Sequence, residues 1–107
     1  NNPMKLEIKL PGLDHCPIQD IVYIEGRGNY SIVFLANKKQ IVIAKTLKKF
    51  EAQFRLHSFI RIHKSYLINK DNIPAFKARE CVEVPTSLGN SLPISRRKLE
   101  MVRQSLG

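Results

Sequence analysis

Short runs of strand-forming residues, each closed by a turn signal, follow one another along most of this sequence and limit the folds open to it. In residues 4–10 the apolar side chains occupy every second position, the pattern of a strand with one buried face, and Pro11-Gly12 ends it. Further β-branched and aromatic runs lie at residues 18–25, 30–36 and 40–44. The last two of these runs predict a hairpin whose basic turn, Asn37-Lys38-Lys39, faces solvent.

The second half of the sequence continues the pattern. The run that starts at Phe59 alternates, with Ile60 and Ile62 on one face and Arg61 and His63 on the other. Residues 64–69 fit either a tight turn or a continuing strand. Three more short runs surround the turn signals Pro85 and Gly89-Asn90. They predict a β-meander over residues 73–78, 81–84 and 91–94.

Two short helices interrupt the predicted strands. The first follows Thr46, whose hydroxyl can accept a hydrogen bond from an unpaired amide of the first turn. It should end near Arg55, and its apolar residues at helical spacing are Leu47, Phe50 and Phe54. The second is predicted to be capped by Ser95, and its apolar residues are Leu99, Val102 and Leu106.

The length of 107 residues allows one hydrophobic core, so residues 1–107 are expected to form a single domain excised from a longer protein. No stretch approaches the roughly 18 consecutive apolar residues of a membrane span, and no signal peptide is recognisable. A cytoplasmic location is therefore expected. Cys16 and Cys81 are too few for a zinc site and are expected to be plain thiols, so no metal or other cofactor is predicted.

Positive charge is concentrated in the middle of the sequence. The chain carries 18 Lys and Arg against 9 Asp and Glu, a formal net charge of +9. Residues 1–25 hold two basic and four acidic side chains, whereas residues 27–70 hold ten basic side chains and one acid, Glu51. Such an excess favours a polyanionic partner, with nucleic acid as the leading candidate. A module that binds a membrane surface or an acidic protein would carry the same charge, and this alternative stays open.

The sequence lacks the arrangements that catalysis needs. Its carboxylates are scattered, without a pair poised for acid and base chemistry. In His63-Lys64-Ser65, neighbours along a strand point to opposite faces, and no nucleophile frame surrounds them. Gly26-Arg27-Gly28 does not have the spacing of a phosphate-binding loop. The chain is therefore not expected to be an enzyme.

Donors suited to DNA gather in three places, residues 27–30, 61–69 and 95–98. Arginine can donate two hydrogen bonds to guanine, asparagine can pair with adenine, and lysine or serine can hold phosphate. The start of the last helix adds free amides that suit a phosphate. Taken singly, a charged side chain also fits a solvated face, which is the preferred interpretation of Lys38, Lys39, Lys48, Lys49 and Lys77. For His63, a structural hydrogen bond is as good an interpretation as a DNA contact.

Single-stranded RNA is the main alternative among nucleic acids, because exposed aromatic side chains on a basic sheet stack with bases. Aromatic residues make up only 7% of the chain, Trp is absent, and most Phe residues fall on apolar patterns. Tyr30 and Tyr66 are the exceptions. Duplex DNA is favoured over RNA on this chemistry.

One long motif makes the prediction more specific. Residues 59–69, FIRIHKSYLIN, followed by Ile73, resemble the signature of the LytTR DNA-binding domain. The resemblance runs from about residue 4 to residue 106, with all segments in the same order. Its other supporting segments are residues 21–26, Asn29-Tyr30, Thr46-Leu47 and residues 93–97.

The resemblance implies an elongated, mainly β fold of about ten short strands in small sheets with one or two short helices. It further implies the output domain of a bacterial two-component transcription regulator, with an N-terminal receiver domain in the same chain. Such domains bind promoter DNA by placing loops into successive major grooves. Two copies are expected at each site, which consists of paired direct repeats.

The resemblance also assigns roles to individual residues. It implies base contacts by Tyr30, Lys64 and Arg96. The bases read by Tyr30 and Lys64 stay open, because these positions vary among family members, whereas the planar fork of Arg96 suits guanine. Asn69 is expected to hold backbone rather than DNA. The residues implied as phosphate contacts or loop supports are Arg27, Asn29, Lys45, Arg61, His63, Ser65 and Arg97.

Overall fold

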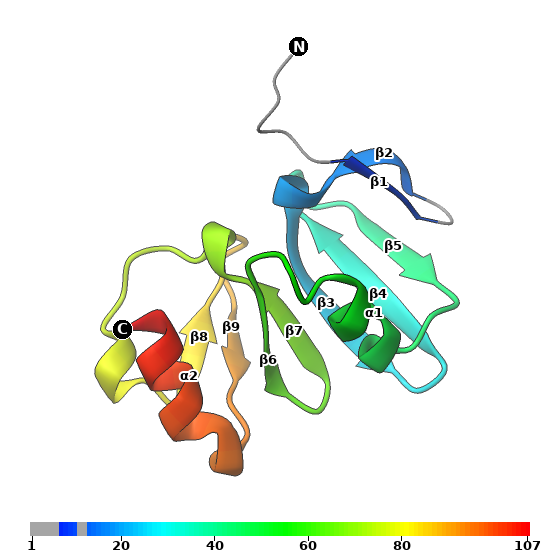
Figure 1. Ribbon diagram of the computed structural model, residues 1–107. Coiled ribbons are helices and arrows are strands. Elements are labelled where there is room, and N and C mark those ends of the chain that lie inside the picture. The colour runs from blue at the N-terminus through cyan, green and yellow to red at the C-terminus, as the bar shows by residue number, and fades with distance from the viewer. Residues whose placement is uncertain (1–6, 11–12) are drawn as a thin grey trace.

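The computed structural model describes residues 7–10 and 13–107, which form nine strands and two α-helices (Figure 1). The strands are β1 (Glu7–Leu10), β2 (Leu13–Pro17), β3 (Ile21–Arg27), β4 (Tyr30–Leu35), β5 (Gln40–Ile43), β6 (Phe59–His63), β7 (Tyr66–Asn69), β8 (Glu83–Pro85) and β9 (Ser91–Pro93). The helices are α1 (Leu47–Gln53) and α2 (Leu99–Leu106), and short 3-10 helices cover Ile18–Asp20, Lys70–Asn72, Ala78–Glu80 and Arg96–Lys98. The predicted mainly β fold is confirmed. Residues 4–6 of the first predicted strand and its terminating Pro11-Gly12 lie outside the described residues.

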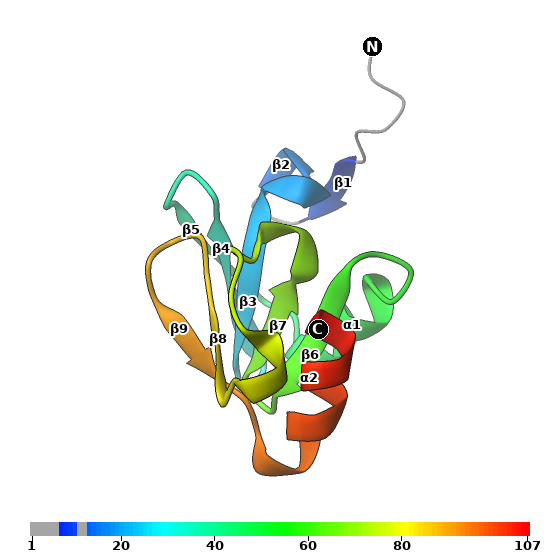
Figure 2. The same cartoon turned by 90° about the vertical axis from the view of Figure 1, so that its left-hand side faces the viewer.

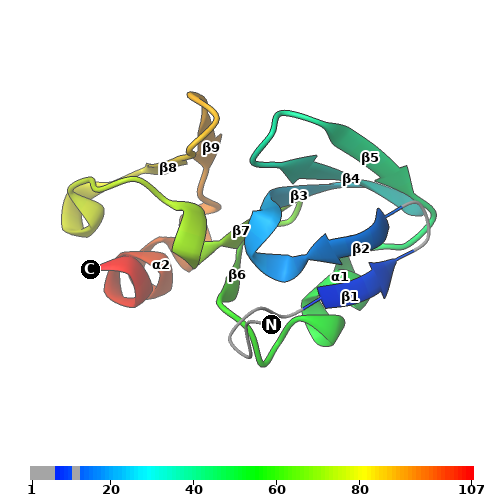
Figure 3. The same ribbon diagram turned by 90° about the horizontal axis from the view of Figure 1, so that it is seen from above.

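A five-stranded antiparallel sheet in the order β5-β4-β3-β7-β6 forms the centre of the molecule. The strands β1 and β2 form one separate antiparallel pair, and β8 and β9 form another. Seen from above, α1, β1 and β2 lie on one side of the central sheet, and α2, β8 and β9 lie on the other (Figure 3). Figure 2 views the molecule from the side that α2, β8 and β9 cover.

Each face of the central sheet therefore has its own apolar core. Leu47 and Phe50 of α1 are buried in the first core, and Val84 of β8 and Val102 of α2 are buried in the second. Burying apolar side chains on both faces stabilises the sheet by removing them from water.

A bulge in β3 overrides the simple alternation of faces. The register of β3 against β4 shifts between Ile21 and Tyr23, which inserts an extra residue in β3. As a result, Ile21 and Ile24 belong to the first core, whereas Val22 and Tyr23 both belong to the second. A strict period of two would have placed Ile21 and Tyr23 on the same face.

The hairpins follow the predictions with small shifts at their ends. The run at residues 18–25 is divided, since Ile18–Asp20 is a 3-10 helix and β3 continues through Gly26 to Arg27. The predicted hairpin of β4 and β5 is confirmed, with an exposed basic turn between them. The ambiguous segment at residues 64–69 contains both alternatives, a two-residue turn at Lys64-Ser65 and then β7.

The first helix begins as its capping residue predicts. The hydroxyl of Thr46 accepts a hydrogen bond from the Lys49 amide (3.3 Å), and the helix ends at Gln53, two residues before the expected end. Its predicted apolar residues, Leu47, Phe50 and Phe54, are all buried.

The predicted meander is wrong in its first segment. Residues 73–78 form no strand, and only β8 and β9 pair in this part of the chain. Pro74 has no amide hydrogen to donate to a ladder, which disfavours a strand here. Ile73 and Phe76 are partly buried against the second core by their side chains alone. The apolar residues of this segment therefore pack a loop against the core and do not form a paired strand.

The predicted cap at Ser95 is also wrong. Its buried hydroxyl makes no hydrogen bond to any described residue, and α2 begins at Leu99 after the 3-10 helix Arg96–Lys98. The Ser95 amide instead donates to the carbonyl oxygen of Ile62 (2.9 Å), which attaches the end of β9 to β6. In α2 itself, the predicted apolar positions do face the second core, with Val102 fully buried.

Cys16 lies in the first core and Cys81 in the second, so the two thiols are buried on opposite faces of the sheet. Within the described residues, no helix combines the length and apolar character needed to cross a bilayer.

Candidate nucleic-acid interface

Three turns meet at one end of the central sheet, at the bottom of Figure 1. They are the β3–β4 turn, the β6–β7 turn and the segment of Ser95 with Arg96–Lys98. The Gly26 amide donates to the Ser65 carbonyl oxygen (2.8 Å), which places the first turn beside the second. The bond from the Ser95 amide to Ile62 places the third segment on the other side of the second turn. Strand pairing and the hydrogen bond from Ser95 to Ile62 thus bring the three predicted donor segments to one end of the sheet.

The β3–β4 turn presents its polar residues to solvent. Gly28 has a φ of 77°, a backbone conformation that favours glycine, and this allows β3 to reverse tightly into β4. Asn29 and Tyr30 are exposed, and Tyr30 is 39% exposed. Arg27 is exposed as well, and its Nε donates to the Glu25 carboxylate at 2.7 Å. All three predicted residues of this turn are accessible to a ligand.

The β6–β7 turn is held by Arg61. Its Nε donates to the His63 carbonyl oxygen (2.8 Å), and its Nη2 donates to the Lys64 carbonyl oxygen (2.5 Å). Its Nη1 donates to Glu51 Oε1 on α1 (2.8 Å). With these donors engaged inside the protein, the geometry favours Arg61 as a loop support over Arg61 as a phosphate contact. The Lys64 side chain is exposed at the tip.

His63 contributes a second internal bond to the same turn. The Ser65 amide donates to His63 Nδ1 at 3.1 Å, so Nδ1 acts as an acceptor. The imidazole ring also lies 5.5 Å from the Tyr66 ring, centroid to centroid. His63 and Ser65 therefore have structural roles in shaping the turn that presents Lys64.

A basic hollow of about 630 Å³ separates the Lys64 turn from the segment that follows β9. Five of its lining side chains are cationic and one is acidic, and the acid, Glu51, is already paired with Arg61. The surplus of positive charge suits phosphate oxygens. The lining residues are Glu51, Arg61, His63, Lys64, Ser95, Arg96, Arg97 and Lys98.

Lys45 lies at the same end of the sheet, but its side chain is directed onto α1. Its Nζ donates to Gln53 Oε1 (2.5 Å) and lies 4.9 Å from the centre of the Phe50 ring. Its carbonyl oxygen accepts a hydrogen bond from Ser31 Oγ (2.7 Å). These contacts favour a supporting role for Lys45.

Asn69 lies at the opposite end of β7 and is 1% exposed. Its Nδ2 donates to the Ile21 carbonyl oxygen (2.9 Å), and its Oδ1 accepts from the Asp71 amide (3.0 Å). Asn69 thus fastens backbone segments and lies away from the three turns.

Two residues near the turns were not expected from the sequence. The sequence shows Glu51 only as an isolated acid, but in the structure its carboxylate accepts a hydrogen bond from Arg61 Nη1. Gly26 lies against the start of α1, where an added Cβ would be 3.0 Å from Leu47 Cβ. No sequence spacing indicates either contact, because both depend on how α1 packs on the sheet.

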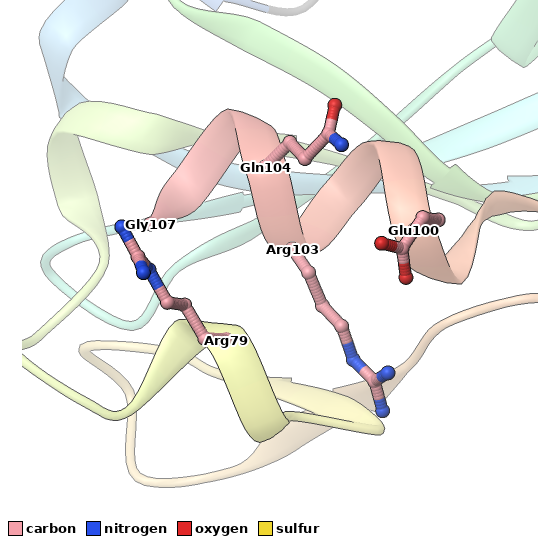
Figure 4. Close-up of a pocket in the computed structure, with 5 residues that line it drawn as sticks. All are labelled: Arg79, Glu100, Arg103, Gln104 and Gly107. Atoms are coloured by element: carbon pink, nitrogen blue, oxygen red, sulfur yellow. The ribbon is translucent and has the colours of Figure 1, made fainter.

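A second hollow, beside α2, does not form a comparable site (Figure 4). It has a volume of about 420 Å³ and includes Arg79 and Arg103. Their guanidinium groups point in different directions in Figure 4, and Arg103 Nε donates to the Cys81 carbonyl oxygen (2.9 Å). In the described part of the chain, no group of three His, Cys, Asp or Glu side chains could hold a metal ion.

Comparison with known proteins identifies the fold. The chain superimposes on the LytTr DNA-binding domain of a Bacillus cereus protein assigned as a methyl-accepting/DNA response regulator, with a TM-score of 0.72 and 23% identity. That match covers 94% of this chain and 96% of the other. The CO-responsive transcriptional regulator RcoM of Rhodospirillum rubrum is 28% identical over 86 residues. This covers 78% of this chain but only 36% of the length of RcoM.

A family model, the LytTr DNA-binding domain, matches residues 13–107. That range contains all three turns and the basic hollow. The family is one of DNA-binding domains and not of enzymes, in agreement with the scattered carboxylates of the sequence. The fold, the basic edge and the family model agree, and the chain belongs to the LytTR family of DNA-binding domains.

Proposed function

We propose that the chain reads double-stranded DNA in a sequence-specific manner through the three turns at one end of its central sheet. The observation that carries this proposal is that Tyr30, Lys64 and Arg96 are all exposed at one end of the sheet, where strand pairing and the Ser95–Ile62 hydrogen bond bring their turns together. Base edges in the major groove are read by such side-chain donors. Arg96 is proposed to donate to guanine through two of its three guanidinium nitrogens.

Affinity is proposed to come from the phosphate backbone. Arg27, Arg97 and Lys98 are proposed to neutralise phosphates on either side of the proposed base contacts, and Asn29 is proposed to donate a hydrogen bond to a phosphate. Lys45, Arg61, His63 and Ser65 are proposed to support the turns, since their polar atoms bond within the protein. This division of roles predicts that the phosphate contacts set the salt dependence of binding, and that the base-contacting turns with their supports set the discrimination between DNA sequences.

The wider setting of this domain is proposed as transcription regulation. RcoM is named as a transcriptional regulator, and the Bacillus cereus relative is assigned as a response regulator. We propose that residues 1–107 are a single output domain, controlled by a receiver domain in the same protein and located in the cytoplasm with promoter DNA. Two copies are proposed to bind direct repeats on one face of the duplex, spaced by a whole number of turns of roughly 10.5 base pairs.

RNA binding through stacked aromatic residues has less support. Tyr66 is half-buried and packs against His63 and Tyr23, so its ring is not presented to a base. Tyr30 is the exposed aromatic side chain of this edge among the described residues. A single exposed ring is a poor platform for successive bases.

The proposed function is tested by fluorescence anisotropy with a labelled duplex carrying paired direct repeats selected from random DNA. The controls are a scrambled duplex and a single strand, each measured over a salt series. We expect the selected duplex to bind at least ~10³-fold tighter than the scrambled one. Equal binding of both duplexes, abolished alike by salt, would show only a generic polyanion surface. Preference for the single strand would favour RNA-type recognition.

A further inference from the structure

Glu51 is the only acid among the described residues that line the basic hollow. Its side chain is 45% exposed on α1, where it faces cations that the proposed function assigns to DNA. An acid at this place opposes the approach of phosphate, so its presence calls for a compensating benefit. The contacts of Arg61 indicate what that benefit is.

Arg61 is held from two directions. Its side chain is 18% exposed and lies between α1 and the β6–β7 turn. On one side Nη1 donates to Glu51 Oε1, and on the other side Nη2 and Nε donate to the carbonyl oxygens of Lys64 and His63. A guanidinium has a planar, fixed fork of donors, so the carboxylate that holds Nη1 also sets the direction of Nη2.

Without the carboxylate, Arg61 would have a strong competing partner in the complex. A DNA phosphate in the hollow would attract the guanidinium through a charge-assisted hydrogen bond. Turning toward that phosphate would remove the bond to the Lys64 carbonyl oxygen and release the tip of the turn. The Glu51 carboxylate opposes this exchange because it accepts a hydrogen bond from Arg61 Nη1 on the side of α1.

We propose that Glu51 is a positioning residue for base reading, acting through Arg61 to fix the turn that presents Lys64. This role rests on the proposed function, because it concerns how one of its three turns is held. It links α1, which supplies none of the proposed base contacts, to discrimination between DNA sequences.

The proposal makes a prediction opposite in sign to simple electrostatics. Glu51→Gln removes a negative charge from a surface that approaches phosphate, so charge alone predicts tighter binding to every duplex. Positioning predicts weaker binding to the selected duplex, with scrambled duplex bound equally or slightly more tightly. The ratio of the two affinities therefore separates the two effects.

Anisotropy titrations of the wild type, Glu51→Gln and Glu51→Ala on selected and scrambled duplex provide the test. Asp71→Asn is the matched control, since it changes the net charge equally at the opposite end of β7. We expect the ratio of affinities to fall about three- to tenfold for Glu51→Gln, and at least as much for Glu51→Ala. Asp71→Asn should leave it unchanged. Thermal unfolding establishes that each variant is folded.

A double-mutant cycle with Lys64→Ala tests the route of the effect. If Glu51 acts by presenting Lys64, Glu51→Gln should change the ratio less than about twofold once Lys64 is replaced. A full, additive effect in that background would show that Glu51 acts independently of Lys64 and would overturn the positioning role. An unchanged or increased ratio in Glu51→Gln alone would also overturn it while leaving the proposed function intact. Equal affinities of the wild type for the selected and the scrambled duplex would instead reject the proposed function.

Discussion

The Nη2 atom of Arg61 donates to the backbone carbonyl oxygen of Lys64 at 2.5 Å, across the tip of the β6–β7 turn. This bond links a residue of the sheet to the residue that is proposed to read a base. A lysine at position 61 would keep the charge but has one nitrogen, which cannot reach three acceptors in the same planar geometry. The relationship between these two residues therefore depends on the guanidinium and not on its charge alone.

We expect Arg61→Lys to lower the affinity for the selected duplex by about 1 to 2 kcal/mol and to leave the affinity for scrambled duplex nearly unchanged. The physical reason is that the turn loses its fixed shape while the net charge is kept. Anisotropy on both duplexes measures the two affinities. Arg55→Lys, at an exposed position beyond α1, is the control and should change neither. Equal losses on both duplexes would assign Arg61 a phosphate contact instead.

Arg96→Ala should cost about 1 to 3 kcal/mol on the selected duplex and much less on scrambled DNA. The reason is that Arg96 is exposed at the end of the sheet where the three turns lie, and is proposed to donate to guanine. Arg79→Ala removes the same charge from an exposed arginine beside Gly107, the residue that follows α2. This control should show only a small, sequence-independent change. Similar effects of the two substitutions would mean that Arg96 supplies charge without reading a base.

Replacement of Asn69 should affect stability and not DNA discrimination. Asn69→Ala removes two hydrogen bonds from a fully buried side chain, and we expect the free energy of unfolding to fall by about 1 to 3 kcal/mol. Urea denaturation measures this loss. Asn37→Ala removes a bond in an exposed turn and should cost under about 1 kcal/mol. A changed ratio of affinities in folded Asn69→Ala would contradict its purely structural role.

Alkaline pH should reveal the burial of Tyr23. Burial raises the pKa of Tyr23 above its ordinary value of 10.0, although the hydrogen bond from Asn90 acts in the opposite direction. The Tyr23 phenol therefore loses its proton at a lower pH in the unfolded chain than in the folded one. The stability that the neutral phenol contributes below pH 10 is lost as the pH rises through the raised pKa of the folded state. Unfolding free energies of wild type and Tyr23→Phe, measured across this window, should diverge, with the wild type falling more steeply. Parallel curves would contradict the raised pKa.

Local patterns were sufficient to predict most elements of the fold. Thr46 capped α1 as expected, and the basic turn between β4 and β5 emerged from its flanking β-branched runs. The bulge between Ile21 and Tyr23 could not be predicted, because every residue from 21 to 24 is apolar and any register fits the pattern. The predicted cap at Ser95 was wrong because the backbone of this residue attaches the end of β9 to β6. The predicted strand at residues 73–78 was wrong because its apolar side chains pack as a loop against the second core.

In the candidate site, too, some features could be predicted from the sequence and others could not. The resemblance predicts Tyr30, Lys64 and Arg96 as base contacts, and strand pairing together with the Ser95–Ile62 hydrogen bond explains why they lie at one end of the sheet. The partners of Arg61 could not be predicted, since Glu51 lies on a helix and meets β6 only after α1 packs over the first core. Residues that touch a ligand can leave a motif in the sequence, whereas residues that hold them depend on tertiary packing.

The most direct test of the central proposal is to map amide chemical shifts by NMR while the selected duplex is added. We expect the largest changes at residues 27–30, 63–65 and 95–98, the three turns at one end of the sheet. The exposed turn at Lys38 and Lys39 and the 3-10 helix Ala78–Glu80 should change little, although both contain exposed cationic side chains. Changes concentrated in these reference segments, or spread evenly over every basic side of the molecule, would contradict reading by the three turns.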